Sequence, residues 1–221
     1  MLDFTLRIYE KLLKTILDHQ YNFLTFREYL NNTGYSDKLI ILRHDVDRLP
    51  HNSQMTAILE NKMGIRGTYY FRTKACSFIP EIIEQIEKLG HEIGYHYENM
   101  ENCGGNFEQS IIDFENNLNK MRKVVRVDTI CMHGSPLSKW DNRDLWKKYD
   151  YSDFGILGEP YFDILETDIS YLTDTGRSWD GRKISIRDKI NDHSISDLSI
   201  KKTSELIEAG YKMVQQFFCL V

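Results

Sequence analysis

The residues most suited to chemistry are two aspartates separated by a valine, Asp45 and Asp47. They follow Leu39 to Leu42, an apolar run typical of a strand that is buried on both faces. In an extended segment, side chains two residues apart point the same way, and two carboxylates in one site repel each other unless a cation or a proton compensates. One could therefore bind a metal ion while the other acts as a base. The pair could equally lie in a solvated loop, where Asp47 pairs with Arg48 or Asp45 caps the next helix.

A second group of chemical side chains lies in residues 90–98 (GHEIGYHYE). His96 and Glu98 come at the end of the strand predicted there, near the level of the two aspartates. His96 could supply an imidazole nitrogen, and Asp47 an oxygen, to one divalent metal ion. His91 begins the same strand, so we expect it at the opposite end of the fold in a structural role.

Strands and helices alternate along the chain, which predicts right-handed βαβ units and a parallel sheet. The apolar runs predict strands at 39–42, 67–71, 91–96, 127–132, 153–157, 169–173 and 214–221, and the amphipathic segments predict helices at 53–63, 80–89, 107–122, 141–149 and 203–209. Polar side chains then follow the ends of successive strands, namely Asp45, Asp47, Arg72, His96, His133 and Asp174. Such a distribution is what the active site of a (β/α) barrel needs. The sequence also lacks the Gly-rich phosphate turn that is typical of a doubly wound sheet. We therefore expect a distorted seven-stranded (β/α) barrel.

The length of 221 residues bounds the organisation of the chain. A full eight-stranded barrel usually takes about 250 residues, so seven strands account for most of the difference. Residues 1–36 read as a helical extension packed on the barrel, with a capping box between Thr25 and Glu28, and residues 37–221 read as the barrel domain. Because the sequence stops on an apolar strand, we expect the catalytic domain to continue past Val221.

Composition excludes several classes of protein. The formal net charge of −5 argues against a general nucleic-acid binder. No run of 18 apolar residues predicts a membrane span, and the N-terminus lacks the apolar core of a signal peptide. The four cysteines form no C-x-x-C pair, which favours free thiols in a reducing cytoplasm.

Three segments in order resemble the polysaccharide deacetylases of the NodB-homology class, the family-four carbohydrate esterases. They are residues 43–47 (RHDVD), 64–72 (GIRGTYYFR) and 90–96 (GHEIGYH). Residues 131–138 (CMHGSPLS) and 172–179 (LTDTGRSW) resemble an atypical branch of that family associated with O-antigen and other surface-polysaccharide gene sets. The resemblance implies a metal-dependent hydrolase that removes acetyl groups from an N-acetylated sugar. It also implies that Asp45 is the general base, and that Asp47 and His96 bind the metal, expected to be zinc.

One departure from the family pattern concerns the third metal ligand. Most members have a second histidine four residues after the one that matches His96, but here that position is Met100. A thioether suits neither zinc nor a harder cation well. His133, at the end of the adjacent strand, is the preferred substitute, and Glu98 is the close alternative. His133 could instead contact the substrate.

Other residues are candidates for binding a carbohydrate substrate. Arg72 could bind a carboxylate or phosphate, or hold Asp45 in place. Asp174 is a further candidate, and Trp179 could either stack on a sugar ring or pack under a loop. The histidine that family members use to protonate the leaving amine has no counterpart after the last strand. A catalytically silent barrel that binds a glycan or a biosynthetic partner is therefore the alternative function, and metal-dependent phosphoester hydrolysis is the third.

Overall fold

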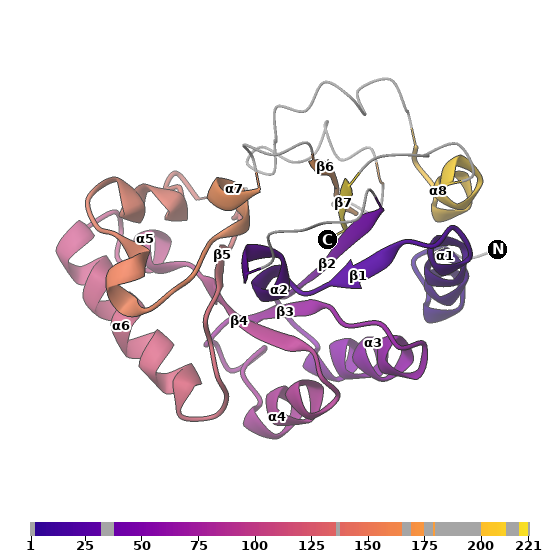
Figure 1. Ribbon diagram of the computed structural model, residues 1–221. Coiled ribbons are helices and arrows are strands. Elements are labelled where there is room, and N and C mark those ends of the chain that lie inside the picture. Colours follow the sequence, from indigo (N-terminus) through magenta and orange to yellow (C-terminus); the bar gives the residue numbers. More distant parts are fainter. Residues whose placement is uncertain are drawn as a thin grey trace.

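The structure is a computed structural model, and its topology is that of an α/β protein with a parallel sheet (Figure 1). It describes residues 3–31, 38–135, 138–164, 169–174, 179, 200–210 and 217–220. Seven strands pair in the described residues: β1 (Asn22–Leu24), β2 (Leu39–Val46), β3 (Thr68–Phe71), β4 (Glu92–Tyr97), β5 (Ile130–Met132), β6 (Ile169–Leu172) and β7 (Phe217–Leu220). The order across the sheet is β5-β4-β3-β2-β7-β6, and β1 pairs with β2.

Strand β2 is the centre of this arrangement. Its first half, from Leu39 to Leu42, pairs with β1 and with β7, whereas its second half, from Arg43 to Val46, pairs with β3. All the pairings are parallel, so the carboxyl ends of β2, β3, β4 and β5 lie at one edge. That edge receives the polar side chains that the sequence places after each strand.

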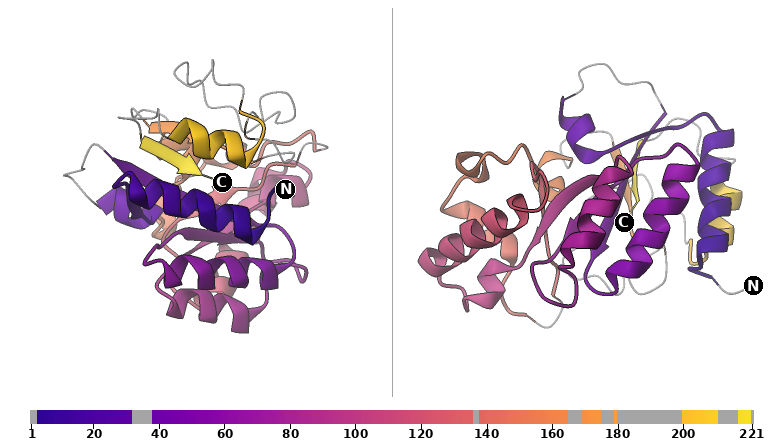
Figure 2. Two further views of the ribbon diagram at one scale, coloured as in Figure 1. Left: turned by 90° about the vertical axis from the view of Figure 1, so that its right-hand side faces the viewer. Right: turned by 90° about the horizontal axis from the view of Figure 1, so that it is seen from below.

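The helices cover the sheet as βαβ crossovers (Figures 1 and 2). They are α1 (Leu6–Asp18), α2 (Phe26–Asn31), α3 (Pro50–Lys62), α4 (Pro80–Lys88), α5 (Asn99–Asn102), α6 (Phe107–Arg122), α7 (Pro160–Asp163) and α8 (Thr203–Gly210), with 3₁₀ helices η1 (Asn142–Lys147) and η2 (Tyr151–Phe154). Helix α1 contacts α8, and α3 contacts α4, as both views of Figure 2 show. No helix in the described ranges is long and apolar enough to cross a bilayer.

Local sequence signals explain where several helices begin. The predicted capping box is confirmed, because Glu28 accepts the Thr25 amide at 2.9 Å and Thr25 accepts the Glu28 amide at 3.2 Å. Asn106 caps α6 by accepting the Gln109 amide. Pro50 and Pro80 occupy the first turns of α3 and α4, where a missing N–H costs nothing.

One expected strand is wrong, and one observed strand was not expected. Residues 153–157 do not form a strand: Asp150 caps the helical turn η2, and Gly155 takes a left-handed conformation that ends it. Only one bridge, Thr129 to Gly158, extends the sheet at this point. The N-terminal segment contains the expected helices, α1 and α2. Between them lies the unexpected strand β1, whose three residues are too few to give an alternating pattern in the sequence.

Closure into a barrel remains a prediction. The path of pairings ends at β5 on one side and β6 on the other, and no pairing joins these two strands in the described part of the chain. The division at residues 36 and 37 also remains a prediction.

The two faces of β2 meet different surroundings because its side chains alternate. Leu39 and Ile41 pack with Phe26 of α2, and Arg43 and Asp45 continue this face. The opposite face, which carries Ile40, Leu42 and His44, packs on a cluster built from α1, α8 and the segment before α8. That cluster contains Leu12, Leu13, Leu172, Trp179, Ile200 and Leu206.

Candidate active site

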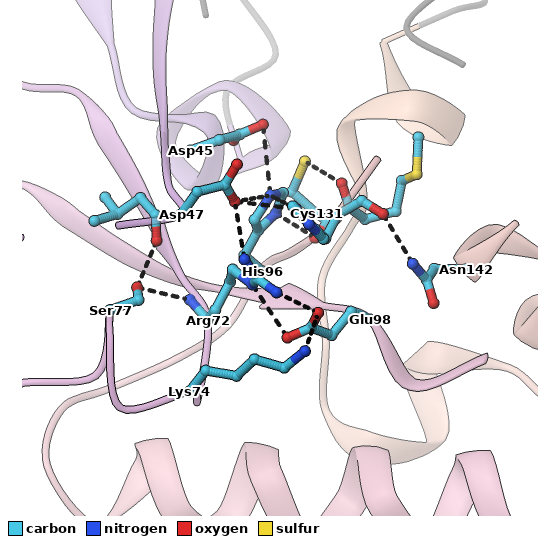
Figure 3. Close-up of polar contacts among 12 residues, drawn as sticks. Asp45, Asp47, Arg72, Lys74, Ser77, His96, Glu98, Cys131 and Asn142 are labelled. Carbon is cyan, nitrogen blue, oxygen red and sulfur yellow. Dashed lines mark hydrogen bonds and ion pairs between the residues drawn. The ribbon is translucent and has the colours of Figure 1, made fainter. Parts of the chain in front are cut away.

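Five of the predicted site residues meet at the carboxyl ends of β2 to β5, and Figure 3 labels four of them, Asp45, Asp47, Arg72 and His96. Asp45 lies near the end of β2 and Asp47 just after it. Arg72 follows β3, and His96 is the penultimate residue of β4, opposite Cys131 of β5. His133 follows β5, where its amide donates to the Tyr97 carbonyl at 2.8 Å and so extends the β4–β5 ladder. The parallel register therefore places His133 beside His96.

His96 is oriented by the backbone of β5. Its Nδ1 lies 2.9 Å from the carbonyl oxygen of Cys131, and because a carbonyl can only accept, Nδ1 carries the proton. The Nε2 atom is left with a lone pair that faces Asp47. Burial lowers the pKa of His96, and although Asp45 and Asp47 act in the opposite direction, the imidazole stays neutral at neutral pH. A neutral imidazole fixed through its other nitrogen is the usual state of a metal ligand.

Three ligand atoms converge at this place. Asp47 Oδ1 lies 3.0 Å from His133 Nδ1 and 3.5 Å from His96 Nε2, and the two histidine nitrogens are 3.2 Å apart. Zinc at about 2.0–2.1 Å from tetrahedral ligands would separate those ligands by about 3.3–3.4 Å. Asp47 Oδ1 is also buried without a hydrogen-bond partner of good geometry. The donor set therefore fits a divalent cation in both spacing and chemistry. Asp45, His96 and Cys131 form a second cluster of potential ligands.

The pKa of Asp47 is lowered in these surroundings. Burial acts to raise it, but the contact with His133 and the charges of His96, His133 and Arg72 outweigh burial. Asp47 is therefore an ionised carboxylate over the pH range in which His96 is neutral, which is the state that a metal ligand requires.

Asp45 is held by Arg43, a residue that the sequence analysis did not single out. Arg43 donates from Nε to Asp45 Oδ1 at 3.1 Å and from Nη2 to Oδ2 at 2.8 Å, and it is almost completely buried. It also donates to the Tyr161 hydroxyl at 3.1 Å. Because Arg43 and Asp45 are two positions apart in a strand, their side chains share one face, and the sequence alone could have predicted this pair. The expectation that Arg72 could hold Asp45 is replaced by this pair.

Arg72 instead pairs with Glu98. Its Nε and Nη2 donate to the two carboxylate oxygens at 3.1 and 2.6 Å, and Lys74 Nζ lies 2.9 Å from Oε2. Burial acts to raise the pKa of Glu98, but these two cations lower it overall. With both oxygens engaged by cations, Glu98 is a poor alternative to His133 as a metal ligand. Arg72 Nη1 reaches within 4.0 Å of Asp47, so this ion pair borders the site.

Met100, at the position where the sequence resemblance predicts a second histidine, lies in the core. Met100 is in α5, is 1% exposed and packs with the main hydrophobic cluster. The loop that carries His133 is fixed from the same region, because Asn142 donates to the His133 carbonyl at 2.8 Å and accepts the Glu101 amide at 3.1 Å. Asn142 is a supporting residue that no local pattern in the sequence indicates.

Two further buried ionisable groups, one near the site and one away from it, are fixed by backbone contacts. Glu159 accepts the amides of Met132 and Tyr161 at 2.9 and 2.6 Å, and burial raises its pKa to about 7. His91 accepts the Gly67 amide and lies 3.0 Å from the Ala57 carbonyl, away from the strand ends that carry Asp47. The structural role expected for His91 is thus supported by its contacts.

Asp174 and Trp179 lie apart from this cluster. Trp179 is 9% exposed, stacks on Phe4 with ring centroids 5.9 Å apart, and donates to Thr203 Oγ1 at 3.0 Å. It belongs to the cluster on the His44 face of β2, and Asp174 lines a cavity with it there. The two side chains therefore do not join the Asp47 cluster as one substrate-binding surface.

Comparisons with known proteins support the fold. No family model matches the chain, and no curated protein matches it by sequence. A solved structure described as a Streptococcus mutans CE4 esterase superposes with a TM-score of 0.50 at 15% identity, covering 88% of this chain and 89% of that one. At this identity the likeness shows that the chain shares the fold of a CE4 esterase.

Proposed function

We propose that this protein is a metal-dependent hydrolase that removes acetyl groups from an N-acetylated sugar, in the biosynthesis of a bacterial surface polysaccharide. The observation that carries the proposal is the convergence of Asp47 Oδ1, His96 Nε2 and His133 Nδ1 within 3.5 Å of one another, next to Asp45. The shared fold with a CE4 esterase and the ordered motifs at residues 43–47, 64–72 and 90–96 support the same reaction class.

In this proposal each residue has a separate role. Asp47, His96 and His133 hold the divalent cation, for which zinc suits the nitrogen and oxygen donors. Such a cation lowers the pKa of bound water and polarises a carbonyl oxygen. Asp45 Oδ2, 3.8 Å from His96 Nε2, accepts the proton of the attacking water. Arg43 holds both oxygens of Asp45 and fixes the direction in which that carboxylate faces.

The test is release of acetate from N-acetylated oligosaccharides by the purified protein, before and after chelation and after zinc is added back. We expect activity to depend on the metal and to fall at least about 10²-fold in Asp45→Asn and in Asp47→Ala. Asp153→Asn, a charge change at an exposed position in η2, is the matched control. Unchanged acetate release in both site variants would contradict the proposal.

The second candidate function is a catalytically silent protein that binds a glycan. The burial of Met100 in the core favours it, because the second histidine of the usual helical pair has no equivalent on α5. A protein that binds glycans but takes up no divalent metal in equilibrium dialysis would support this alternative.

A further inference from the structure

A cavity of about 460 Å³ lies on the face of β2 opposite Asp45. It is lined by the start of α1, by α3, by Leu42 and His44 of β2, by Asp174 and Trp179, and by Thr203 at the start of α8. Its volume falls in the range of about 300–1,000 Å³ found for small-molecule sites. The proposed reaction uses none of these residues.

The walls of the cavity combine aromatic surface with short polar side chains. Phe4, Tyr9 and Trp179 provide rings, and Asn52, Thr56 and Thr203 provide amide and hydroxyl groups. Apolar ring faces beside hydroxyl and amide groups are suited to a polyhydroxylated ring, whose C–H face packs on aromatics while its hydroxyls form hydrogen bonds.

The described residues that line the cavity include one carboxylate, that of Asp174. Asp3 lies beside it and accepts the Thr203 amide at 2.9 Å, but its charge is offset by Lys202. His44 is paired through Nε2 with the buried Glu60 at 2.7 Å, so its positive charge, when present, is compensated. None of the described lining residues is a lysine or an arginine. An anionic ligand would meet repulsion, and a cation would be attracted to Asp174 and to the ring faces.

We propose that this cavity binds a protonated amino sugar, the class of product that the proposed deacetylation generates. The choice of a sugar rests on the proposed function, whereas the preference for an ammonium group rests on the charge of the lining. Removal of an acetyl group converts a neutral acetamide into an amine that is protonated near neutral pH, and Asp174 is the carboxylate that distinguishes the two. The cavity would then retain a deacetylated residue of the glycan on the face opposite the site of reaction.

The experiment compares two disaccharides that differ only in acetylation, β-1,4-diglucosamine and its N,N′-diacetyl form. Binding is measured by ligand-observed NMR at pH 7, where Asp174, whose pKa desolvation raises to about 6, is mostly ionised. The Asp47→Ala variant is used throughout so that the diacetyl form is not hydrolysed. We expect it to bind the diamine at least about tenfold more tightly than the diacetyl form.

A second variant assigns that preference to the cavity. Asp174→Asn, added to Asp47→Ala, should remove the preference, whereas the exposed change Asp153→Asn should leave it intact. Equal binding of the two disaccharides, no binding of either, or a preference that persists in Asp174→Asn would each overturn the inference. Absence of acetate release by the unmodified protein would refute the proposed function but would leave these binding results standing.

Discussion

Replacing His133 with alanine tests the composition of the metal centre most directly. His133 Nδ1 is one of three ligand atoms in the cluster, at 3.0 Å from Asp47 Oδ1 and 3.2 Å from His96 Nε2. His133 comes from the end of β5, whereas the esterases that the motifs resemble have their third ligand one helical turn after the histidine that matches His96. If His133 only contacts substrate, its removal should spare metal affinity.

The expected magnitude follows from the number of ligands. Structural zinc sites with four protein ligands bind with about 10–16 kcal/mol, so an even share is about 2.5–4 kcal/mol per ligand. His133→Ala should therefore weaken zinc binding by about 10²- to 10³-fold. The two remaining ligands, Asp47 and His96, would still hold the ion weakly.

The assay is a competition titration of zinc against a chromophoric chelator at pH 7.5, with the fold checked by circular dichroism. Asp153→Asn, a charge change at an exposed position in η2, is the matched control, and its zinc affinity should equal that of the unmodified protein. An affinity of His133→Ala within threefold of the unmodified protein would refute the assignment of His133 as a ligand.

Three further predictions concern stability, measured by urea denaturation. Arg43→Met should lower the free energy of unfolding by about 2–3 kcal/mol, because it strands the partly buried Asp45 carboxylate, and adding Asp45→Asn should recover part of that loss; additive losses would contradict the pairing. Glu159 has its pKa raised by burial to about 7 from 4.5, so its proton stabilises the fold below pH 4.5 and this contribution, about 3 kcal/mol, disappears as the pH rises through 7. Glu159→Gln should remove that part of the pH dependence between pH 4.5 and 8, and an unaltered profile would show that the carboxyl is already ionised. Thr25→Ala should cost about 1 kcal/mol through loss of the capping box at α2, and no loss would show that the cap contributes nothing.

Local patterns in the sequence were sufficient where neighbouring residues alone decide the outcome. The capping box depends on Thr25 and Glu28, which are three residues apart, and it forms as predicted. The Asn106 cap of α6 is an equally local contact. The strand predicted at residues 153–157 does not form, because Asp150 and Gly155 stabilise a helical turn there. The pattern of hydrophobic residues did not reveal which of these local preferences would win.

In the candidate site, too, some features could be predicted from the sequence and others required the structure. That Asp45, Asp47 and His96 lie together follows from their places at the ends of parallel strands, which are fixed by strand order. That Arg43 holds Asp45, and that Glu98 pairs with Arg72, required side-chain positions. These pairs arise because each buried charge must find a partner, and the sequence offers more partners than the fold brings within reach.

The sequence by itself determined the chemistry available to this protein: an acidic pair and histidines at strand ends, in an alternating α/β pattern. Tertiary structure decided which of these residues share a site. It brings His133 beside His96 through the β4–β5 register, buries Met100 in the core, and places Asp174 and Trp179 on the opposite face of β2. The physical reason is that strand register and alternation of side chains decide which face a residue occupies, and both are set by contacts between segments distant in the sequence.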